Sequence, residues 1–235
     1  MWLTMGYLAR TVLILLLTAL SSPSLLAEGL SAGADPRINR PYQDPDFHLW
    51  QDIFESPGRE VYDRREEILR ALKLQKGMSV ADIGAGTGLF TWLFSTEVGE
   101  QGQVFAVDIS SEFIRNILQI AKQSNLNNVK GIVNSQTSLE LPPDTIDVVF
   151  VCDTYHHFEE PHVMLKLFHQ SLKPGGRLVI IDFRKKPGFS SNWVMDHVRL
   201  DRKGVIAEIE QSGFRLSGEE SFLRANYFLT FNKIK

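Results

Sequence analysis

The chain has 235 residues, of which 43% are hydrophobic and 23% are charged, as is usual for one ordinary globular domain. Its formal net charge of −3 argues against the basic surface that nucleic-acid-binding proteins carry, so we expect no DNA or RNA partner. With Cys152 as its single cysteine, the chain forms no internal disulfide.

The first 27 residues differ in composition from the rest of the chain. Arg10 precedes an apolar run from Thr11 to Leu20, and a short segment ending at Ala27 follows. These are the parts of a secretory signal, and the run is shorter than the about 20 residues that span a membrane. We therefore expect residues 1–27 to be a signal peptide, or an uncleaved anchor that associates with a membrane, and the domain to be exported to the periplasm or another extracytoplasmic space. A cytoplasmic location is the alternative if the segment is not a working signal.

Residues 28–58 are expected to form an N-terminal arm ahead of the domain. Glycines and prolines are scattered among aromatic residues there, and no helical or strand period is sustained. The segment is therefore either an arm that becomes ordered by docking or a linker. Its aromatic residues Phe47, Trp50 and Phe54 either line an acceptor pocket or pin the arm to the core.

From residue 59 to residue 235 helices and strands alternate. Apolar residues on one face predict a helix over residues 60–74, against the sheet. The elements that follow are strand 78–83, helix 89–98, strand 103–107, helix 111–124, strands 129–133 and 146–151, a helix from 161, strand 177–183 and helix 202–211. Two strand-like runs, 214–223 and 226–234, predict a closing hairpin. This order predicts an α/β three-layer sandwich whose doubly wound sheet is mostly parallel, with an antiparallel C-terminal hairpin strand.

A glycine-rich turn follows the first strand of the domain, from Gly84 to Gly88. Its missing side chains let the backbone turn tightly and approach a ligand, while the next helix presents free N–H groups. Asp82 comes just before the turn and can take a ligand's ammonium group. Asp108 stands twenty residues past Gly88, the distance at which a carboxylate reaches the two hydroxyls of a ribose. The pair indicates a nucleoside ligand.

The spacing of the glycines argues against a dinucleotide. A dinucleotide-binding turn needs the pattern G-x-G-x-x-G, but here the third glycine comes one residue early, at Gly88, and Leu89 follows it. A nucleotide-dependent oxidoreductase is therefore a weaker alternative.

Four segments in order carry a family resemblance: VADIGAGTG, AVDIS, LELPPDTIDVVF and LKPGGRLVIIDF. They resemble the successive motifs of class I S-adenosylmethionine-dependent methyltransferases, above all the small-molecule branch that includes the ubiquinone and menaquinone methyltransferases. The resemblance extends from about residue 60 to the C-terminus. It implies a Rossmann-like fold, S-adenosyl-L-methionine as cofactor, and an enzyme that methylates a small-molecule or lipid-like acceptor. A non-catalytic cofactor-binding protein of the same fold remains the alternative.

The same resemblance assigns the cofactor site residue by residue. The methionine part of the cofactor would contact Asp82, Gly84, Ala85, Gly86 and Gly88. Asp108 would bind the ribose and Ile109 would pack on the adenine. The residue that commonly accepts from the adenine amino group is acidic in this family but falls at Ser135 here, so the Ser135 hydroxyl or the Gln136 amide would replace it.

Two residues at the entrance to the first helix, Arg59 and Tyr62, are further candidates for cofactor binding. The guanidinium of Arg59 suits a bidentate pair with the cofactor carboxylate. The alternative is a hinge with exposed charge.

The loop after the fourth strand, from Cys152 to Phe158, borders the transferable methyl group in this family. A methyl group on a sulfonium is already activated, so the protein mainly aligns the acceptor and removes its proton. His156 or His157 is the expected base, with Asp153 or Tyr155 orienting cofactor or substrate. The alternative is that these histidines only cap or pack the loop.

No metal site is expected from the histidines. Of His156, His157, His162 and His169, only the last two share a helix face, and no cysteine or paired carboxylate completes a ligand set. His197, which follows Asp196, is expected to belong to a solvated helical pair.

Overall fold

The computed structural model describes residues 32–234. The predicted signal or anchor over residues 1–27 lies outside the described residues, as do the first residues of the predicted arm. Among the helices of the described part, none combines the length and the apolar character needed to span a bilayer.

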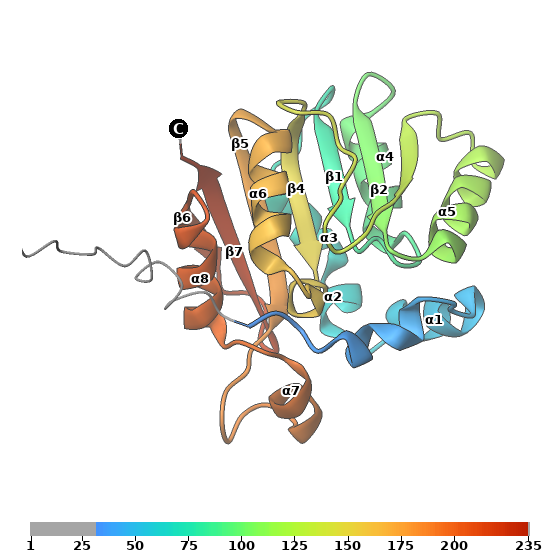
Figure 1. Ribbon diagram of the computed structural model, residues 1–235. Helices are drawn as coiled ribbons and strands as arrows, with labels where there is room; N and C mark the ends of the chain where they lie inside the picture. The colour runs from blue at the N-terminus through green and yellow to red at the C-terminus, as the bar shows by residue number, and fades with distance from the viewer. Residues whose placement is uncertain (1–31, 235) are drawn as a thin grey trace, which may run out of the picture. The chain divides into compact units, whose positions relative to one another are not determined.

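Seven strands form one sheet in the order β3-β2-β1-β4-β5-β7-β6 (Figure 1). The strands from β3 to β5 in that order are parallel, and β7 runs antiparallel to both of its neighbours. Their bounds are β1 Ser79–Ile83, β2 Gln103–Asp108, β3 Val129–Val133, β4 Ile146–Cys152, β5 Leu172–Phe183, β6 Phe214–Glu220 and β7 Asn226–Lys233. The predicted doubly wound, mostly parallel sheet with a C-terminal hairpin is confirmed.

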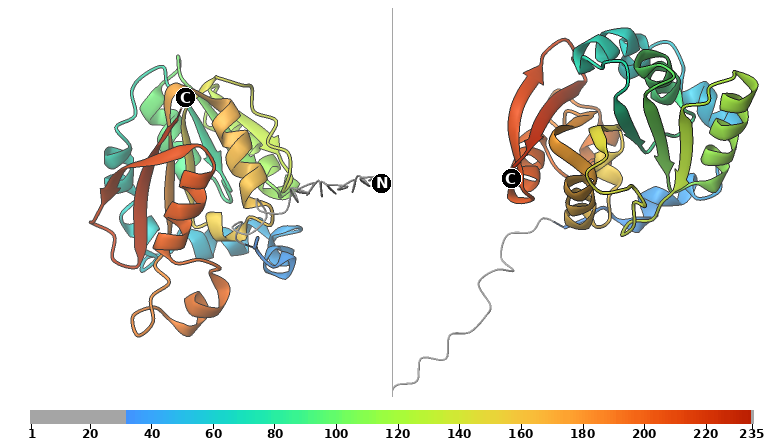
Figure 2. Two further views of the ribbon diagram at one scale, coloured as in Figure 1. Left: turned by 60° about the vertical axis from the view of Figure 1, so that its left-hand side comes forward. Right: turned by 90° about the horizontal axis from the view of Figure 1, so that it is seen from above.

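Helices cover both faces of this sheet. One face carries α3 (Arg65–Leu72), α4 (Leu89–Val98) and α5 (Ser111–Gln123), and the other carries α6 (Pro161–Ser171) and α8 (Arg202–Gln211). Strand β4 shows why: Val148 and Phe150 pack toward α3 and α4, whereas Val149 and Val151 pack toward α6. Because successive side chains of a strand point to opposite faces, a strand apolar throughout is buried on both. The views from other sides show the helices flanking the sheet (Figure 2).

The segment between residues 60 and 74 was predicted as one helix and contains two. Helix α2 (Glu60–Asp63) is a single turn, and α3 begins after Arg64, whose φ of −101° and ψ of 13° interrupt the helical path. Lys73 then takes a left-handed conformation with φ of 47°, which ends α3. Strand β5 is longer than predicted, because its pairing begins at Leu172 and continues past the Gly175-Gly176 turn.

The arm contains regular structure that the sequence pattern did not predict. It forms a 3₁₀-helix, η1 (Pro36–Tyr42), and a short α-helix, α1 (Phe47–Phe54). The Asp46 carboxylate caps α1 by accepting the Leu49 N–H at 3.1 Å. Two turns are too few to establish a helical period in a sequence.

The carboxyl ends of the parallel strands are covered by chain segments from distant parts of the sequence. Helix α1 lies there, and so do the 3₁₀-helix η2 (Tyr155–His157) and α7 (Asn192–His197) (Figure 1). The strand order reverses between β1 and β4, the position at which open α/β sheets bind ligands.

Candidate active site

A cavity of about 280 Å³ opens at the carboxyl ends of β1, β2 and β4. Its walls come from the glycine turn after β1, the end of β2, the loop after β4, the arm and α7. Its size is near the lower end of the range for small-molecule sites, and aromatic and polar groups meet in it.

The glycine turn brings its backbone directly to this cavity. Gly84, Gly86 and Gly88 have φ of 71°, 54° and 90°, a region that favours glycine. A Cβ on Gly84 would stand 2.3 Å from the Oγ1 atom of Thr154, so no side chain fits there. Gly84, Ala85 and Gly86 line the cavity, whereas Gly88 does not line it and is the N-cap residue of α4.

Asp108 is the last residue of β2 and is 6% exposed. Its carboxylate holds the glycine turn in place by a hydrogen bond. One carboxylate oxygen accepts the N–H of Gly86 and the other accepts the N–H of Ser110, each at 2.9 Å. Burial raises the pKa of Asp108 to about 6, and the backbone N–H groups oppose that rise. Each oxygen keeps a lone pair that can accept a ribose hydroxyl, and Ile109 lines the cavity beside it.

Asp82 lies at the end of β1, is 3% exposed and lines the same cavity. Its Oδ2 atom accepts a hydrogen bond from the Thr91 hydroxyl at 2.7 Å. Burial raises the pKa of Asp82 to about 7, and the neighbouring charge of Asp108 adds to the rise. A ligand ammonium group beside Asp82 would favour its ionised form, so this carboxyl fits the role predicted for it.

At the adenine side of the site, Gln136 lines the cavity as one of the two residues predicted there. Asn134 and Gln136 line the cavity, but Ser135 does not, since its hydroxyl turns back to accept the N–H of Thr137 at 3.2 Å. Asn134 therefore replaces Ser135 as the cavity residue after β3. The sequence count reached the correct loop, but a count cannot say which side chains of a bent loop point inward.

Arg59 reaches the site but is already paired. Its Nη2 atom donates to Asp153 at 2.8 Å, and its Nη1 atom donates to the carbonyl oxygen of Phe54 at 2.7 Å. A cofactor carboxylate would have to share this guanidinium with Asp153. Tyr62 is outside the set of cavity-lining residues, and its ring centre lies 4.4 Å from the Arg65 guanidinium, so its predicted cofactor contact stays a prediction.

The Asp153 side chain connects the loop after β4 with Arg59 and with β7 through hydrogen bonds. Its two oxygens accept from Arg59 and, at 2.6 Å, from the Nδ2 atom of Asn226 on β7. Its backbone has a φ of 48°, a conformation that non-glycine residues rarely adopt. Burial raises the pKa of Asp153, while Arg59 opposes the rise. These contacts suit a residue that positions its neighbours.

His156 is 3% exposed and is held by a carboxylate that the sequence analysis did not single out. Its Nδ1 atom lies 2.7 Å from Asp182 Oδ1, and its backbone N–H donates to the same carboxylate. Burial disfavours a charged imidazole here, but Asp182 outweighs it and raises the pKa of His156. Asp182 stands near the end of the strand motif LVIIDF, and that position was the available signal.

His157 and His197 complete a group of three imidazoles. The Nδ1 atom of His157 lies 2.9 Å from Asn39 Oδ1. Burial, with His156 and His197 nearby, lowers the pKa of His157 to about 2. His197 was expected in a solvated pair with Asp196, but its ring lies 5.1 Å from that of His156 and 5.3 Å from that of His157.

Three other side chains named in the sequence analysis lie elsewhere. Tyr155 is 1% exposed, and its hydroxyl donates to Glu208 at 2.5 Å, so it does not line the cavity. His162 and His169 belong to α6 and contact Ser212 and the carbonyl oxygen of Ile234, respectively.

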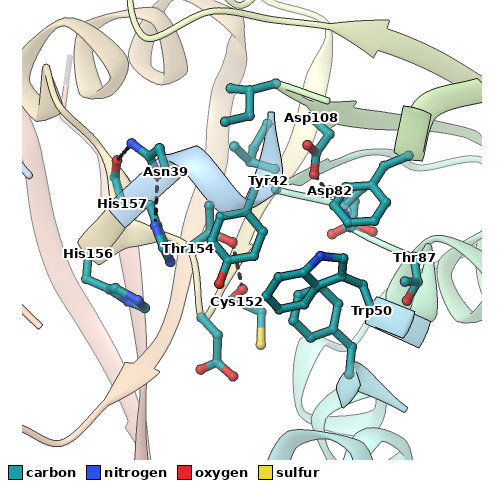
Figure 3. A pocket seen from close by; sticks show the side chains of 18 of the residues that line it. Asn39, Tyr42, Trp50, Asp82, Thr87, Asp108, Cys152, Thr154, His156 and His157 are labelled. Atoms are coloured by element: carbon teal, nitrogen blue, oxygen red, sulfur yellow. Dashed lines mark hydrogen bonds between the residues drawn. The ribbon is translucent and has the colours of Figure 1, made fainter. Parts of the chain in front are cut away.

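Aromatic residues of the arm form a wall of the cavity. Tyr42 and Trp50 have ring centres 4.7 Å apart, and Trp50 and Phe54 are 5.0 Å apart. Phe47 instead packs against Phe113 and pins the arm. Figure 3 shows the histidines at one end of the site, Asp82 and Asp108 at the other, and Tyr42 between them. The cavity thus has a carboxylate end, an apolar middle and a histidine end.

The strand order, the glycine turn and Asp108 together define a class I S-adenosylmethionine-dependent methyltransferase. A family model described as a methyltransferase domain matches residues 74–216, and the chain belongs to that family. The predicted methyltransferase family is confirmed by this match.

Individual proteins are similar to this chain in sequence or in structure. A ubiquinone/menaquinone biosynthesis C-methyltransferase from Marinomonas sp. (strain MWYL1) is 33% identical over 113 residues, 48% of this chain and 45% of that protein. A demethylmenaquinone methyltransferase from Geobacillus stearothermophilus is 29% identical over 148 residues, 63% of each chain. The chain thus matches roughly half to two thirds of the length of these curated relatives. A crystal structure of a SAM-dependent methyltransferase from Aquifex aeolicus has a TM-score of 0.68 and 25% identity, covering 85% of this chain and 99% of that one.

Proposed function

We propose that this protein transfers the methyl group of S-adenosylmethionine to a small, largely apolar acceptor such as a quinone precursor or another lipid-like molecule. The observation that carries the proposal is the cavity itself. It joins the glycine turn and the two buried carboxyls to an aromatic wall and a histidine group. The relatives named for ubiquinone and menaquinone biosynthesis support an acceptor of this kind.

One group of residues would bind the cofactor and another group would bind the acceptor. Asp108 would bind the ribose, Asp82 the ammonium group, and the backbone of Gly84 to Gly86 the methionine part. S-adenosylmethionine supplies a methyl group already activated on a sulfonium, so the chain mainly aligns the acceptor and excludes water. The aromatic wall of Tyr42, Trp50 and Phe54 would hold an apolar ring.

We place removal of the acceptor's proton at the histidine end. His157, whose pKa is about 2, is a poor base near neutral pH. His156, which Asp182 orients, is the stronger of the two predicted bases. Asp153 acts as a positioning residue, because both of its oxygens are engaged.

The cofactor part is tested by melting the purified protein with S-adenosylhomocysteine and, separately, with NADH. S-adenosylhomocysteine should raise the Tm, since a ligand that binds only the native state stabilises it. Asp108→Ala should weaken this binding about tenfold or more, because charge-assisted hydrogen bonds are lost. The exposed Asp44→Ala variant is the control.

The outcomes separate the alternatives. A shift with NADH and none with S-adenosylhomocysteine would favour an oxidoreductase. Tight S-adenosylhomocysteine binding without methyl transfer to any of a panel of quinols and phenols would favour a non-catalytic binding protein.

We also propose that residues 1–27 direct the domain out of the cytoplasm, either as a cleaved signal or as an anchor. The support is the sequence pattern of Arg10 followed by the apolar run. Fractionation of the native host, with N-terminal sequencing, should find the protein outside the cytoplasm and, if it is cleaved, beginning near Glu28. A full-length chain in the cytoplasm would contradict the proposal.

A further inference from the structure

The three imidazoles of His156, His157 and His197 converge at the histidine end of the cavity. Each can offer a ring nitrogen, and these three nitrogens lie within 4.8 Å of one another. They come from η2 and from α7, which are separated by strand β5 along the chain. No local spacing in the sequence brings them together.

Asp182 determines which ring nitrogen of His156 carries the proton. The two Asp182 oxygens accept from the backbone N–H groups of His156 and Phe183, so they act as acceptors. The Nδ1 atom of His156 must then carry the proton that faces Asp182. In the neutral ring the Nε2 atom holds a lone pair, and this atom is buried with no hydrogen-bond partner within residues 32–234.

Asn39 likewise determines which ring nitrogen of His157 carries the proton. The Nδ2 atom of Asn39 donates to the His157 carbonyl oxygen at 3.0 Å and to the Glu159 carboxylate at 2.8 Å. These two bonds turn the Oδ1 atom of Asn39, which is an acceptor, toward His157. The Nδ1 atom of His157 is therefore the donor, and its Nε2 atom keeps the lone pair.

His197 supplies the third nitrogen. Its Nε2 atom is also buried, and it too has no hydrogen-bond partner in the described part of the chain. The ring is held by stacking on Trp193, with centres 4.4 Å apart and planes 20° apart. Three ring nitrogens that faced one another as lone pairs would repel each other, and either a proton or a metal cation between them would remove that repulsion.

We propose that His156, His157 and His197 form a binding site for one divalent transition-metal ion, such as Zn²⁺. Neutral imidazoles are ligands that Zn²⁺ prefers, and three of them with an open fourth position are typical of catalytic zinc sites. The hydrogen bonds to Asp182 and Asn39 match the outer-shell partners that orient metal-binding histidines.

The ring positions agree with this assignment. Imidazoles that share a tetrahedral ion at a Zn–N distance of about 2.1 Å have ring centres roughly 5 Å apart. The two distances from His197 are 5.1 and 5.3 Å, and the rings of His156 and His157 are closer, at 4.3 Å. Nitrogens sharing a tetrahedral ion stand about 3.4 Å apart, and the three nitrogens here lie within 4.8 Å of one another, so binding would close the group by up to about 1.4 Å.

The open coordination position could bind the methyl acceptor. This part of the inference rests on the methyltransferase function proposed above. His156 and His157 line the cavity that contains the glycine turn. An acceptor oxygen bound to the ion there would have a lowered pKa, because the metal charge favours the deprotonated form. The acceptor oxygen could then lose its proton to solvent water before methyl transfer, so that no histidine base would be needed.

The test is metal binding by the full chain without an affinity tag of histidines. After treatment with a chelator, the protein is titrated with ZnCl₂ by calorimetry, and with CoCl₂ while the visible absorption of tetrahedral Co²⁺ is followed. We expect one ion per chain. Absence of binding at one equivalent would overturn the proposal.

Variants locate the site. His197→Gln should weaken Zn²⁺ binding by more than about 100-fold, and Asp182→Asn by about 10- to 100-fold. His48→Gln, on the exposed side of α1, is the matched control and should bind as the parent chain does. Equal affinity in His197→Gln and the parent would overturn the site. His197 is only partly buried, so this variant keeps the test valid if Asp182→Asn does not fold.

A further measurement separates this site from the proposed function. Zn²⁺ binding is measured without cofactor, and S-adenosylhomocysteine binding is measured in the chelator-treated protein. If only Zn²⁺ binds, the methyltransferase proposal fails while the metal site stands. If only S-adenosylhomocysteine binds, the metal site fails while the cofactor site stands.

Discussion

At the scale of single residues, Asp82 and Asp108 are the carboxyl groups that the cavity buries beside the glycine turn. They are 3% and 6% exposed, and burial raises the pKa of both. A carboxyl group that stays neutral in the folded state but ionises in the unfolded chain lowers the free energy of unfolding at every pH between its two pKa values and above. The ligand-free site is therefore prepared for a cationic partner.

This predicts that the ligand-free protein loses stability as the pH rises. The unfolded chain ionises Asp82 near pH 4, but the folded state holds its proton up to a pKa of about 7, so the folded state binds more protons in between. The free energy of unfolding should fall through that window, by on the order of 4 kcal/mol from Asp82. Urea denaturation at about pH 5 and about pH 8 should show about 3 kcal/mol of this fall, because part of the window lies below pH 5.

Asp82→Asn should remove most of this pH dependence, because an amide does not titrate. Asp44→Asn, at an exposed position, should leave it unchanged. An Asp82→Asn variant whose stability still falls as steeply between the two pH values would show that other groups carry the effect.

At the scale of elements, the single-turn helix α2 connects the arm to the C-terminal hairpin. The Glu60 carboxylate accepts the backbone N–H groups of Arg224, Ala225 and Asn226 at 2.6, 2.8 and 2.9 Å. Arg224 and Ala225 end the connection between β6 and β7, and Asn226 begins β7. Asn226 in turn donates to Asp153, so Glu60 holds a residue of the site in place.

Glu60→Ala is expected to lower the free energy of unfolding by about 2 kcal/mol, since hydrogen bonds to a charged group are lost and three N–H groups are left without their acceptor. Chemical denaturation measures the change. Glu66→Ala, at an exposed position in the first turn of α3, should change stability by less than about 0.5 kcal/mol. Equal effects of the two variants would mean that the contacts of Glu60 contribute little.

At the scale of the whole described domain, Arg59, Asp153 and Asn226 bring together the arm, the end of β4 and β7. The Asp153 side chain is only 9% exposed and that of Arg59 is 25% exposed. Removing one partner of such a pair leaves a buried charge uncompensated. The pair therefore couples parts of the chain that are distant in sequence.

A double-mutant cycle tests this coupling. Arg59→Met should cost about 3 kcal/mol, and adding Asp153→Asn should restore at least about 1 kcal/mol, because the isolated carboxylate is gone. Denaturation of the four proteins measures it. Arg115→Met, which breaks the exposed pair with Glu112 on α5, should cost no more than about 0.5 kcal/mol. Additive effects at Arg59 and Asp153 would rule out the coupling.

The local pattern of the sequence was sufficient for the elements and for the cofactor end of the site. The apolar strands, the glycine turn and Asp108 are each defined by neighbours within a few residues or by one strand–helix unit. Their geometry follows from backbone conformation and from the way parallel sheets wind. Helix α1 was missed because two turns give too short a period.

The direction of individual side chains and the contacts between distant segments depended on the tertiary structure. It turned Asn134 rather than Ser135 inward, and it placed Tyr62 outside the cavity. It also brought His197 to His156 and placed Asp182 against that histidine. The sequence alone determined the fold and the position of the glycine turn beside Asp108, because both depend on local patterns. Only the folded chain decided the histidine group, because its members come from different elements that meet only when the sheet is formed.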